Sequence, residues 1–184
     1  MGNVVAGMTM SLDGFIEDAD GSIAALYSDF EEMHQQAPLQ ESIAQTGAVV
    51  IGRRTFAMGN GEWGTEDYEY QVPIFVVTHQ PPLQAPRHTD QLTFTFVTDG
   101  VESAIAQAKA AAGDKDVTVF GGANIIQQVL RAGLADVLVV DIMPVLLGSG
   151  LRLFEHLEDA RVTLEKIDVR EGSARTYLRF RVVK

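Results

Sequence analysis

A glycine pair stands where an apolar run of the sequence gives way to a helical pattern. In VTVFGGANIIQQVL (117–130), a β-branched and aromatic run reaches Gly121 and Gly122, and apolar residues then recur at helical spacing. Glycine permits close approach of a ligand, and the start of the following helix offers unpaired N–H groups at the positive end of its dipole. The pair therefore suits a phosphate group, although a tight strand-to-helix turn with nothing bound would use the same residues.

Two adjacent arginines follow a second apolar run. In AVVIGRRTFAMG (48–59) the run ends at Gly52, and Arg53, Arg54 and Thr55 begin a short helical pattern. Guanidinium groups donate forked hydrogen bonds that match phosphate oxygens, and ligands of α/β proteins gather at the carboxyl ends of parallel strands. Solvated arginines at a helix start are the alternative, although cations there oppose the helix dipole. Together the two stretches suit a ligand with several phosphates.

Carboxylates follow the first apolar run, MTMSLDGFIED (8–18). Asp13 and Gly14 are typical of a turn. Asp29 and the two glutamates after it begin a helical segment, where the helix dipole alone favours acids. An acid there could anchor a substrate beside a cleft if burial raised its pKa, but a structural role is the simpler explanation.

Composition limits the partners that the chain can have. Its 184 residues suit one domain spanning 1–184, and they include no cysteine. The formal net charge of −11 and the pI near 4.7 argue against nucleic-acid and anionic membrane surfaces. No apolar segment has the length of a signal or membrane helix, and no metal-binding pattern such as HExxH occurs, so no metal is expected. We therefore expect a cytoplasmic protein that binds a small molecule.

Strand-like and helical patterns alternate along most of the chain. The predicted strands are 3–10, 48–51, 74–77, 94–97, 117–120 and 137–142, and the predicted helices are 29–45, 53–58, 101–112 and 123–131. This order predicts an α/β fold with a mixed, mostly parallel central sheet flanked by helices. Two alternating runs around EGS within 161–183 predict a C-terminal antiparallel β-hairpin at the edge of the sheet.

These stretches, in this order, resemble the dihydrofolate reductase-like superfamily, and most closely its branch related to the C-terminal reductase domain of the riboflavin-biosynthesis protein RibD. The matching pieces are SLDGFI, IGRRTF and VFGGANIIQQVL, followed by LADVLVVDIMPVLLGSGLRLF. They cover nearly the whole chain, and the run PVLLGSG (144–150) makes the ordered set fairly specific. The resemblance implies an NADPH-binding reductase, commonly dimeric, with a dihydrofolate reductase-like fold.

The resemblance also implies roles for individual residues. Arg53 is similar to the group that meets the 2′-phosphate of NADPH, and Asp29 lies near the place of the substrate-anchoring acid. Arg54 and Thr55 would hold the pyrophosphate together with the residues that begin the helix after β-strand 117–120, and an unusual backbone, such as a cis peptide, is implied at the glycine pair. The remaining implied cofactor contacts are Thr9 and Ile16 at the nicotinamide, Thr78 near the adenosine, and Gly52, Gly121, Gly122, Ala123 and Asn124.

We therefore predict an NADPH-dependent reductase that transfers a hydride to a small pterin- or pyrimidine-like heterocycle, similar in kind to 5-amino-6-(5-phosphoribosylamino)uracil reductase. Phe15 stands where that enzyme has a basic residue, which leaves the substrate open. Phe15 and Trp63 could stack on the substrate, although core packing is simpler for each. The alternatives are a non-catalytic NADP(H)-binding module or sensor, and an acidic interaction scaffold without a nucleotide. A homodimer is expected because residues 145–154 are more apolar than a surface loop requires.

Overall fold

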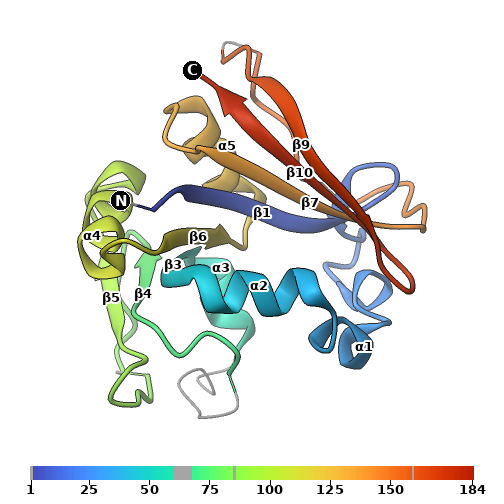
Figure 1. The fold of residues 1–184 in the computed structure, drawn as a ribbon. Helices are drawn as coiled ribbons and strands as arrows, with labels where there is room; N and C mark the ends of the chain where they lie inside the picture. The colour runs from blue at the N-terminus through green and yellow to red at the C-terminus, as the bar shows by residue number, and fades with distance from the viewer. Residues whose placement is uncertain (1, 60–67, 85, 159) are drawn as a thin grey trace.

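An eight-stranded sheet crosses the molecule in the computed structural model, which describes residues 2–59, 68–84, 86–158 and 160–184 (Figure 1). Its strand order is β5-β4-β3-β6-β1-β7-β10-β9. The strands are β1 (Val4–Ser11), β3 (Thr46–Gly52), β4 (Ile74–Val77), β5 (Phe94–Val97), β6 (Asp116–Phe120), β7 (Val137–Met143), β9 (Thr163–Glu171) and β10 (Thr176–Val183). The short strands β2 (Phe15–Glu17) and β8 (Leu151–Arg152) pair with each other in a second sheet.

The strand directions confirm the predicted mixed sheet. Neighbouring strands from β5 to β7 are parallel, whereas β10 runs antiparallel to β7 and β9 runs antiparallel to β10. The last two strands form the predicted C-terminal hairpin, and β9 is the edge strand. The fold is therefore α/β, with its parallel part in the middle and one antiparallel edge.

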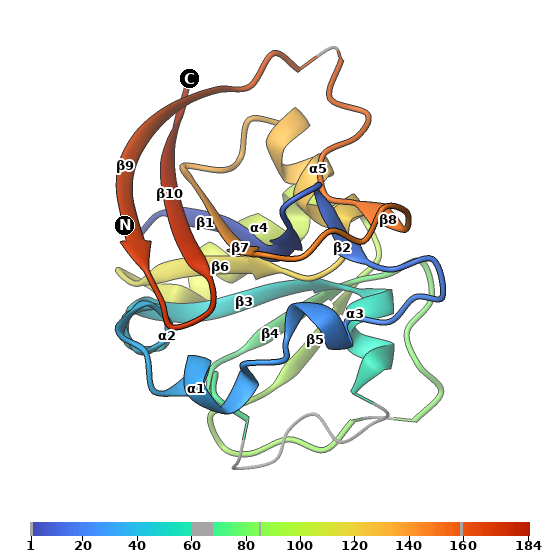
Figure 2. The ribbon, with the colours of Figure 1, turned by 90° about the vertical axis from the view of Figure 1, so that its right-hand side faces the viewer.

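Helices cover both faces of the sheet (Figure 2). The helical elements are η1 (Ala24–Leu26), α1 (Phe30–His34), α2 (Ala37–Gln45), α3 (Arg53–Met58), α4 (Val101–Ala112) and α5 (Ala123–Arg131). Helices α4 and α5 pack on the face that includes Ala48 and Val50 of β3, and α2 and α3 pack on the face that includes Val49 and Ile51. Successive residues of a strand point to opposite faces, so one apolar strand supplies both cores. Within the described ranges no helix has the length and apolarity needed to cross a bilayer.

The predicted helix 29–45 is wrong as one element, because the chain forms α1 and α2 with a break between them. Gln36 is extended, with φ −86° and ψ 143°, and Pro38 lies in the first turn of α2. Proline is tolerated in the first turn of a helix but breaks its interior, so the second helix has to begin just before it. The sequence also gave no indication of β2 and β8, which are too short for a repeating pattern to be recognised.

Candidate functional site

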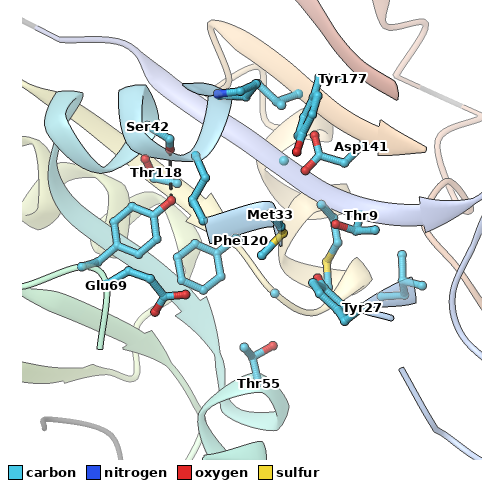
Figure 3. A pocket seen from close by; sticks show the side chains of 18 of the residues that line it. Thr9, Tyr27, Met33, Ser42, Thr55, Glu69, Thr118, Phe120, Asp141 and Tyr177 are labelled. Carbon is cyan, nitrogen blue, oxygen red and sulfur yellow. Dashed lines mark hydrogen bonds between the residues drawn. The ribbon is translucent and has the colours of Figure 1, made fainter. Parts of the chain in front are cut away.

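A cleft of about 840 Å³ lies on the sheet face beside α1 and α2 and reaches the carboxyl ends of the central parallel strands (Figure 3). Tyr27, Phe30 and Met33 line it from the segment around α1, and Phe120 lines it from β6. Figure 3 shows Thr55 at one end and Asp141 at the other. Clefts of this size with aromatic walls and a few polar groups are typical of small-molecule sites.

The glycine pair at the end of β6 has the unusual backbone that was predicted. Gly121 has φ +87° and Gly122 has φ +75°, both in the region that side chains disfavour. A Cβ atom on Gly121 would stand 2.4 Å from Cγ2 and 2.5 Å from Oγ1 of Thr55, so the glycine backbone lies directly against α3. The predicted cis peptide is wrong, because the peptide bonds of the described residues are trans. The two stretches predicted to bind phosphate therefore meet at one place.

The two arginines of α3 differ in their surroundings. Arg54 lines the cleft, its Nη2 lies 2.7 Å from Oε1 of Glu17, and its side chain is still 62% exposed. Arg53 is exposed outside the cleft lining. Gly52 before them is buried, and a Cβ atom there would stand 2.8 Å from Cγ1 of Ile125, so this glycine lets α5 approach β3. One arginine is thus aimed at the cleft and the other at solvent.

The structure brings together about half of the residues predicted to bind the cofactor. Those lining the cleft are Thr9, Ile16, Arg54, Thr55, Gly121 and Gly122. Those outside its lining are Gly52, Arg53, Thr78, Ala123 and Asn124. Thr78 is buried and donates a hydrogen bond to the carbonyl of Gln80, and Ala123 is part of the core.

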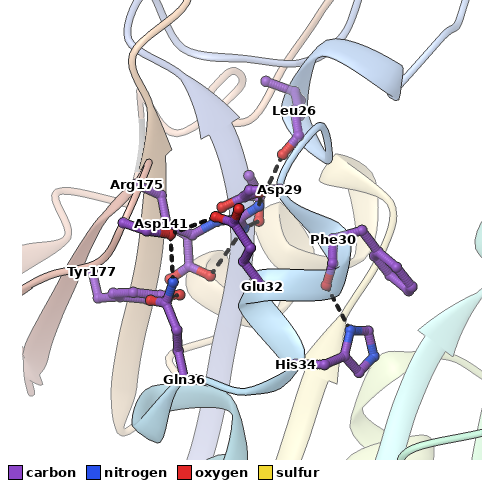
Figure 4. Close-up of polar contacts among 11 residues, drawn as sticks. Leu26, Asp29, Phe30, Glu32, His34, Gln36, Asp141, Arg175 and Tyr177 are labelled. Atoms are coloured by element: carbon purple, nitrogen blue, oxygen red, sulfur yellow. Dashed lines mark hydrogen bonds and ion pairs between the residues drawn. The ribbon is translucent and has the colours of Figure 1, made fainter.

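Asp29 is buried and is held by an arginine from the opposite end of the sequence (Figure 4). The fully buried Arg175 side chain donates from Nε to Oδ2 of Asp29 at 2.9 Å and from Nη2 to Oδ1. It also donates to Oγ1 of Thr9 at 2.9 Å and to the carbonyl of Leu26 at 3.1 Å. The hydrogen bonds and charge of Arg175 lower the pKa of Asp29. Both oxygens of the predicted anchor are therefore already used.

Asp141 is the carboxylate at this end that lines the cleft. It stands in register with Thr9 of β1 on one side and Tyr177 of β10 on the other. Its Oδ2 lies 3.8 Å from Nη1 of Arg175, and its buried Oδ1 has no hydrogen-bond partner among the described residues. Burial raises the pKa of Asp141 to about 6, although Arg175 opposes the shift. Sequence reasoning missed this residue, whose one signal is an acid inside the apolar strand VLVVDIM.

The two residues predicted as stacking walls do not take part in the described cleft. Phe15 is buried outside the cleft lining, with the guanidinium of Arg152 4.4 Å from its ring centroid. Trp63 lies outside the residues that the structure describes. Phe15 therefore serves the packing of the β2–β8 sheet.

Asp13 links the segments SLDG and PVLLGSG in space. Its carboxylate accepts a hydrogen bond from Oγ of Ser11 at 2.6 Å and from the backbone N–H groups of Leu147 at 3.1 Å and Gly148 at 2.7 Å. These donors, with that of Ser11 the strongest, lower the pKa of Asp13 to about 2. The carboxylate thus joins the loop after β1 to the loop after β7, next to the cleft.

A mostly parallel sheet with an antiparallel C-terminal hairpin, and with a cleft at the ends of its central strands, defines a dihydrofolate reductase-like fold. The chain belongs to the RibD C-terminal domain family, whose profile matches residues 3–178. Its structural neighbours include a dihydrofolate reductase. This confirms the family and the fold class that the sequence motifs indicated.

Three proteins illustrate what the chain resembles in sequence and in fold. The chain is 25% identical to the uncharacterized protein YyaP of Bacillus subtilis strain 168, in an alignment that covers 93% of this chain and 89% of YyaP. Its fold matches a protein from Shewanella sp. PV-4 named for riboflavin biosynthesis, with a TM-score of 0.80, 23% identity and 99% of both chains covered. It also matches dihydrofolate reductase from Enterococcus faecalis complexed with NADP(H), with a TM-score of 0.66, 18% identity and coverage of 99% and 97%. At these identities the two structures show a shared fold.

Proposed function

We propose that the protein is an NADPH-dependent reductase that transfers a hydride to a small, flat heterocycle of the pterin or pyrimidine type. The observation that carries this proposal is the cleft itself, which has glycine backbone and an arginine at one end and aromatic walls with a buried carboxylate at the other. The family supports the reaction class, and the Enterococcus faecalis enzyme is named with NADP(H). The reduced nicotinamide would supply the hydride, and the protein would supply binding and orientation.

The glycine end fits the phosphates of a dinucleotide. Gly121 lacks the side chain that would collide with Thr55, so its backbone lies in the cleft wall next to the N–H groups that begin α5. Arg54 and Thr55 would bind the pyrophosphate from the cleft wall, and the exposed Arg53 would bind the 2′-phosphate. The nicotinamide would lie toward Thr9, beside the carboxylate end.

A second function, a non-catalytic NADP(H)-binding module or sensor, is favoured by one observation. Asp29, which the family resemblance implies as the substrate anchor, already uses both carboxylate oxygens on Arg175. A protein that keeps the cofactor site but has lost its substrate anchor would bind NADPH without turnover. Only a turnover measurement separates this function from the reductase.

The test combines binding and turnover. NADPH and NADH are titrated by calorimetry, and NADPH oxidation is then followed by absorbance with a panel of pterins and pyrimidines. We expect tighter binding of NADPH than of NADH and oxidation with at least one member of the panel. Binding without oxidation by any of them would favour the sensor, and failure of both dinucleotides to bind would remove both functions. A structure of crystals soaked with NADPH would then limit the size and polarity of the substrate.

The proposal includes a cytoplasmic homodimer. In residues 145–154 the side chains of Leu146 and Phe154 are 73% and 38% exposed, and a second subunit would cover them. The edge strand β9 adds the exposed Ile167 and Val169. Light scattering should give about 40 kDa, twice the 20.0 kDa of one chain, and a value near 20 kDa at micromolar concentration would contradict the dimer.

A further inference from the structure

The carboxylates that line the cleft differ in how their charge is balanced. Among the described residues, every lining carboxylate except Asp141 lies within 3.2 Å of a basic side chain, namely Arg54, His34 or Arg170. The nearest base to Asp141 is Arg175, at 3.8 Å, which is beyond hydrogen-bond distance. Asp141 is therefore the lining acid whose cationic partner is not in contact with it.

The N–H groups of Arg175 donate to groups other than Asp141. Its Nε and Nη2 atoms donate to Asp29, Nη2 also donates to the carbonyl of Leu26, and Nη1 donates to Thr9. Two carboxylates thus face one guanidinium group, and Asp29 takes its bidentate edge. One negative charge at this end of the cleft has no counterpart among these groups.

The neighbours of Asp141 on the adjacent strands leave its oxygens unused. Tyr177, in register on β10, donates its hydroxyl to Oε1 of Gln36 at 3.0 Å instead. Thr9, in register on β1, accepts from Arg175. Oδ1 of Asp141 is buried, but the side chain as a whole is 22% exposed, so a ligand in the cleft can approach Oδ2. A ligand N–H donated to this carboxylate would offset the free energy lost by burying Oδ1 without a donor.

We propose that Asp141 is a substrate-binding carboxylate, and that it selects flat ligands that present a positively charged pair of N–H donors, such as an amidinium or a protonated amino-heterocycle. This inference rests on the proposed function, because it takes the cleft to be the substrate site. The N–H groups of such a ligand can donate to Oδ2 of Asp141, and its positive charge balances the surplus negative charge. The ring of Tyr27 lines the cleft near Thr9 and would pack on a flat ligand (Figure 3).

The first test uses benzamidine, a flat amidinium, and benzamide, its uncharged counterpart. Each is titrated by NMR into ¹⁵N-labelled protein at pH 7.5. Asp141→Asn should weaken benzamidine by about 10- to 100-fold and leave benzamide almost unchanged, because it removes the charge and keeps the shape. Glu165→Gln removes an exposed carboxylate of β9 that is paired with Arg181 outside the cleft, and it should change neither affinity. Equal benzamidine affinity in wild type and Asp141→Asn would overturn the proposal.

The second test is the pH dependence of the same titration. The charged and titratable groups facing Asp141 are Arg175 and Tyr177 on the β10 side, Asp29 and Tyr27 on the η1–α1 side, and Tyr70 across the cleft. The pKa of Asp29 is lowered and those of Arg175 and the three tyrosines are raised, so all five keep their charge state between pH 5 and pH 7.5. Benzamidine binding should weaken toward pH 5 in the wild type and stay flat in Asp141→Asn. A pH dependence that survives in the variant would assign the effect to another group.

A parallel titration with NADPH separates this inference from the proposed function. Asp141→Asn should change NADPH affinity far less than benzamidine affinity, since the phosphates of NADPH would bind at the glycine pair, at the opposite end of the cleft. If the wild type bound benzamidine through Asp141 but no dinucleotide, the proposed reductase would fail while the carboxylate site stood. If the wild type bound NADPH but Asp141→Asn left benzamidine binding unchanged, the carboxylate site would be contradicted and the proposed reductase would not.

Discussion

The polar groups at the two ends of the cleft differ in how exposed they are and in how far they are paired with one another. At the glycine end, backbone N–H groups and the side chains of Arg54 and Thr55 come from two short stretches, and the arginine is mostly exposed. At the carboxylate end, Asp29 and Arg175 are buried against each other, and Asp141 lies beside them. At the glycine end the arginine is hydrated and can bind an anion. At the carboxylate end most of the charged groups are paired with one another.

This difference separates binding from stability. Removing the exposed Arg53 should appear mainly in ligand affinity, whereas removing Arg54 also takes the partner from Glu17, which is buried. Removing one member of the buried set leaves the others without a partner, so its effect should appear first in folding. The four predictions below test this separation, from the largest expected effect to the smallest.

Arg175→Met should lower the free energy of unfolding by about 3–5 kcal/mol, because it leaves Asp29 buried without a counter-charge. The matched control is Arg181→Met on β10, the strand that follows Arg175; its side chain is 60% exposed and its partner Glu165 is equally accessible. The control should cost less than about 1 kcal/mol. Urea denaturation measures both, and similar small losses would mean that the buried pair contributes no more than a surface pair.

Gly121→Ala should lower the free energy of unfolding by about 2–4 kcal/mol, because the new Cβ would meet Thr55 and the residue has positive φ. Gly122→Ala shares the positive φ, but its Cβ would stand 3.8 Å from Oγ1 of Thr55, an ordinary contact. It should cost only about 1–2 kcal/mol and should weaken NADPH more than folding. Thermal unfolding compares the pair, and equal losses would show that the contact with Thr55 relaxes without cost.

Arg53→Ala should weaken NADPH about 10- to 150-fold and leave NADH almost unchanged, since only NADPH carries the 2′-phosphate. Arg54→Ala should weaken both cofactors by similar factors, because the pyrophosphate is common to both. Arg53→Ala should not lower the midpoint of urea unfolding much, because that side chain is exposed, whereas Arg54→Ala should lower it more, because it leaves the buried carboxylate of Glu17 without its partner. An unchanged NADPH-to-NADH ratio in folded Arg53→Ala would return this arginine to the role of a solvated helix residue.

Asp141→Asn should raise the free energy of unfolding above pH 6 by about 1–2 kcal/mol. The pKa of Asp141 is about 6 in the folded protein and is near the ordinary aspartate value of 3.8 when unfolded, so the folded state binds the proton more tightly. Wild-type stability therefore falls as pH rises from about 4 to about 6. The variant has no carboxyl group at this position, so its stability does not fall in this way. Chemical denaturation from pH 4 to pH 8 measures the difference, which should vanish near pH 4.

Asp136→Asn provides the opposite sign as a control. Burial opposes ionisation of Asp136, but hydrogen bonds from Lys184 and from the backbone of Val4 outweigh it and lower its pKa. Its ionised form therefore stabilises the folded protein above the ordinary pKa of a carboxyl group, and the variant should lose stability at neutral pH. If both variants changed stability in the same direction, burial would not be the cause of the Asp141 effect.

The same contrast determines how much could be predicted from the sequence. The glycine pair and the arginine pair each lie within a few residues of a strand end, so their placement followed from local patterns, and the central strands were predicted within about two residues. The break between α1 and α2 was missed, although Pro38 was a signal for it. Local pattern is sufficient where strand, turn and helix adjoin in the chain.

The carboxylate end could not be predicted in this way. Asp29 and Arg175 are 146 residues apart, and Arg175 stands in a hairpin turn with no pattern around it. Asp141 becomes notable only when β7 is seen between β1 and β10, with a guanidinium group already committed to another acid. Which of several acids remains without a basic partner depends on tertiary contacts. These contacts cannot be recognised from the residues that neighbour the acid in the sequence.

The bridge made by Asp13 limits how this fold can be recombined. Its carboxylate holds two backbone N–H groups that lie 134 and 135 residues further along the chain, so residues 11–14 and 144–150 behave as one unit. A chimera of two family members with a single crossover between these segments would pair the carboxylate of one parent with the loop of the other. Such chimeras should survive only when both parents carry an acid at this position and a loop of the same length, so crossover points that keep the two segments from one parent should be the productive ones.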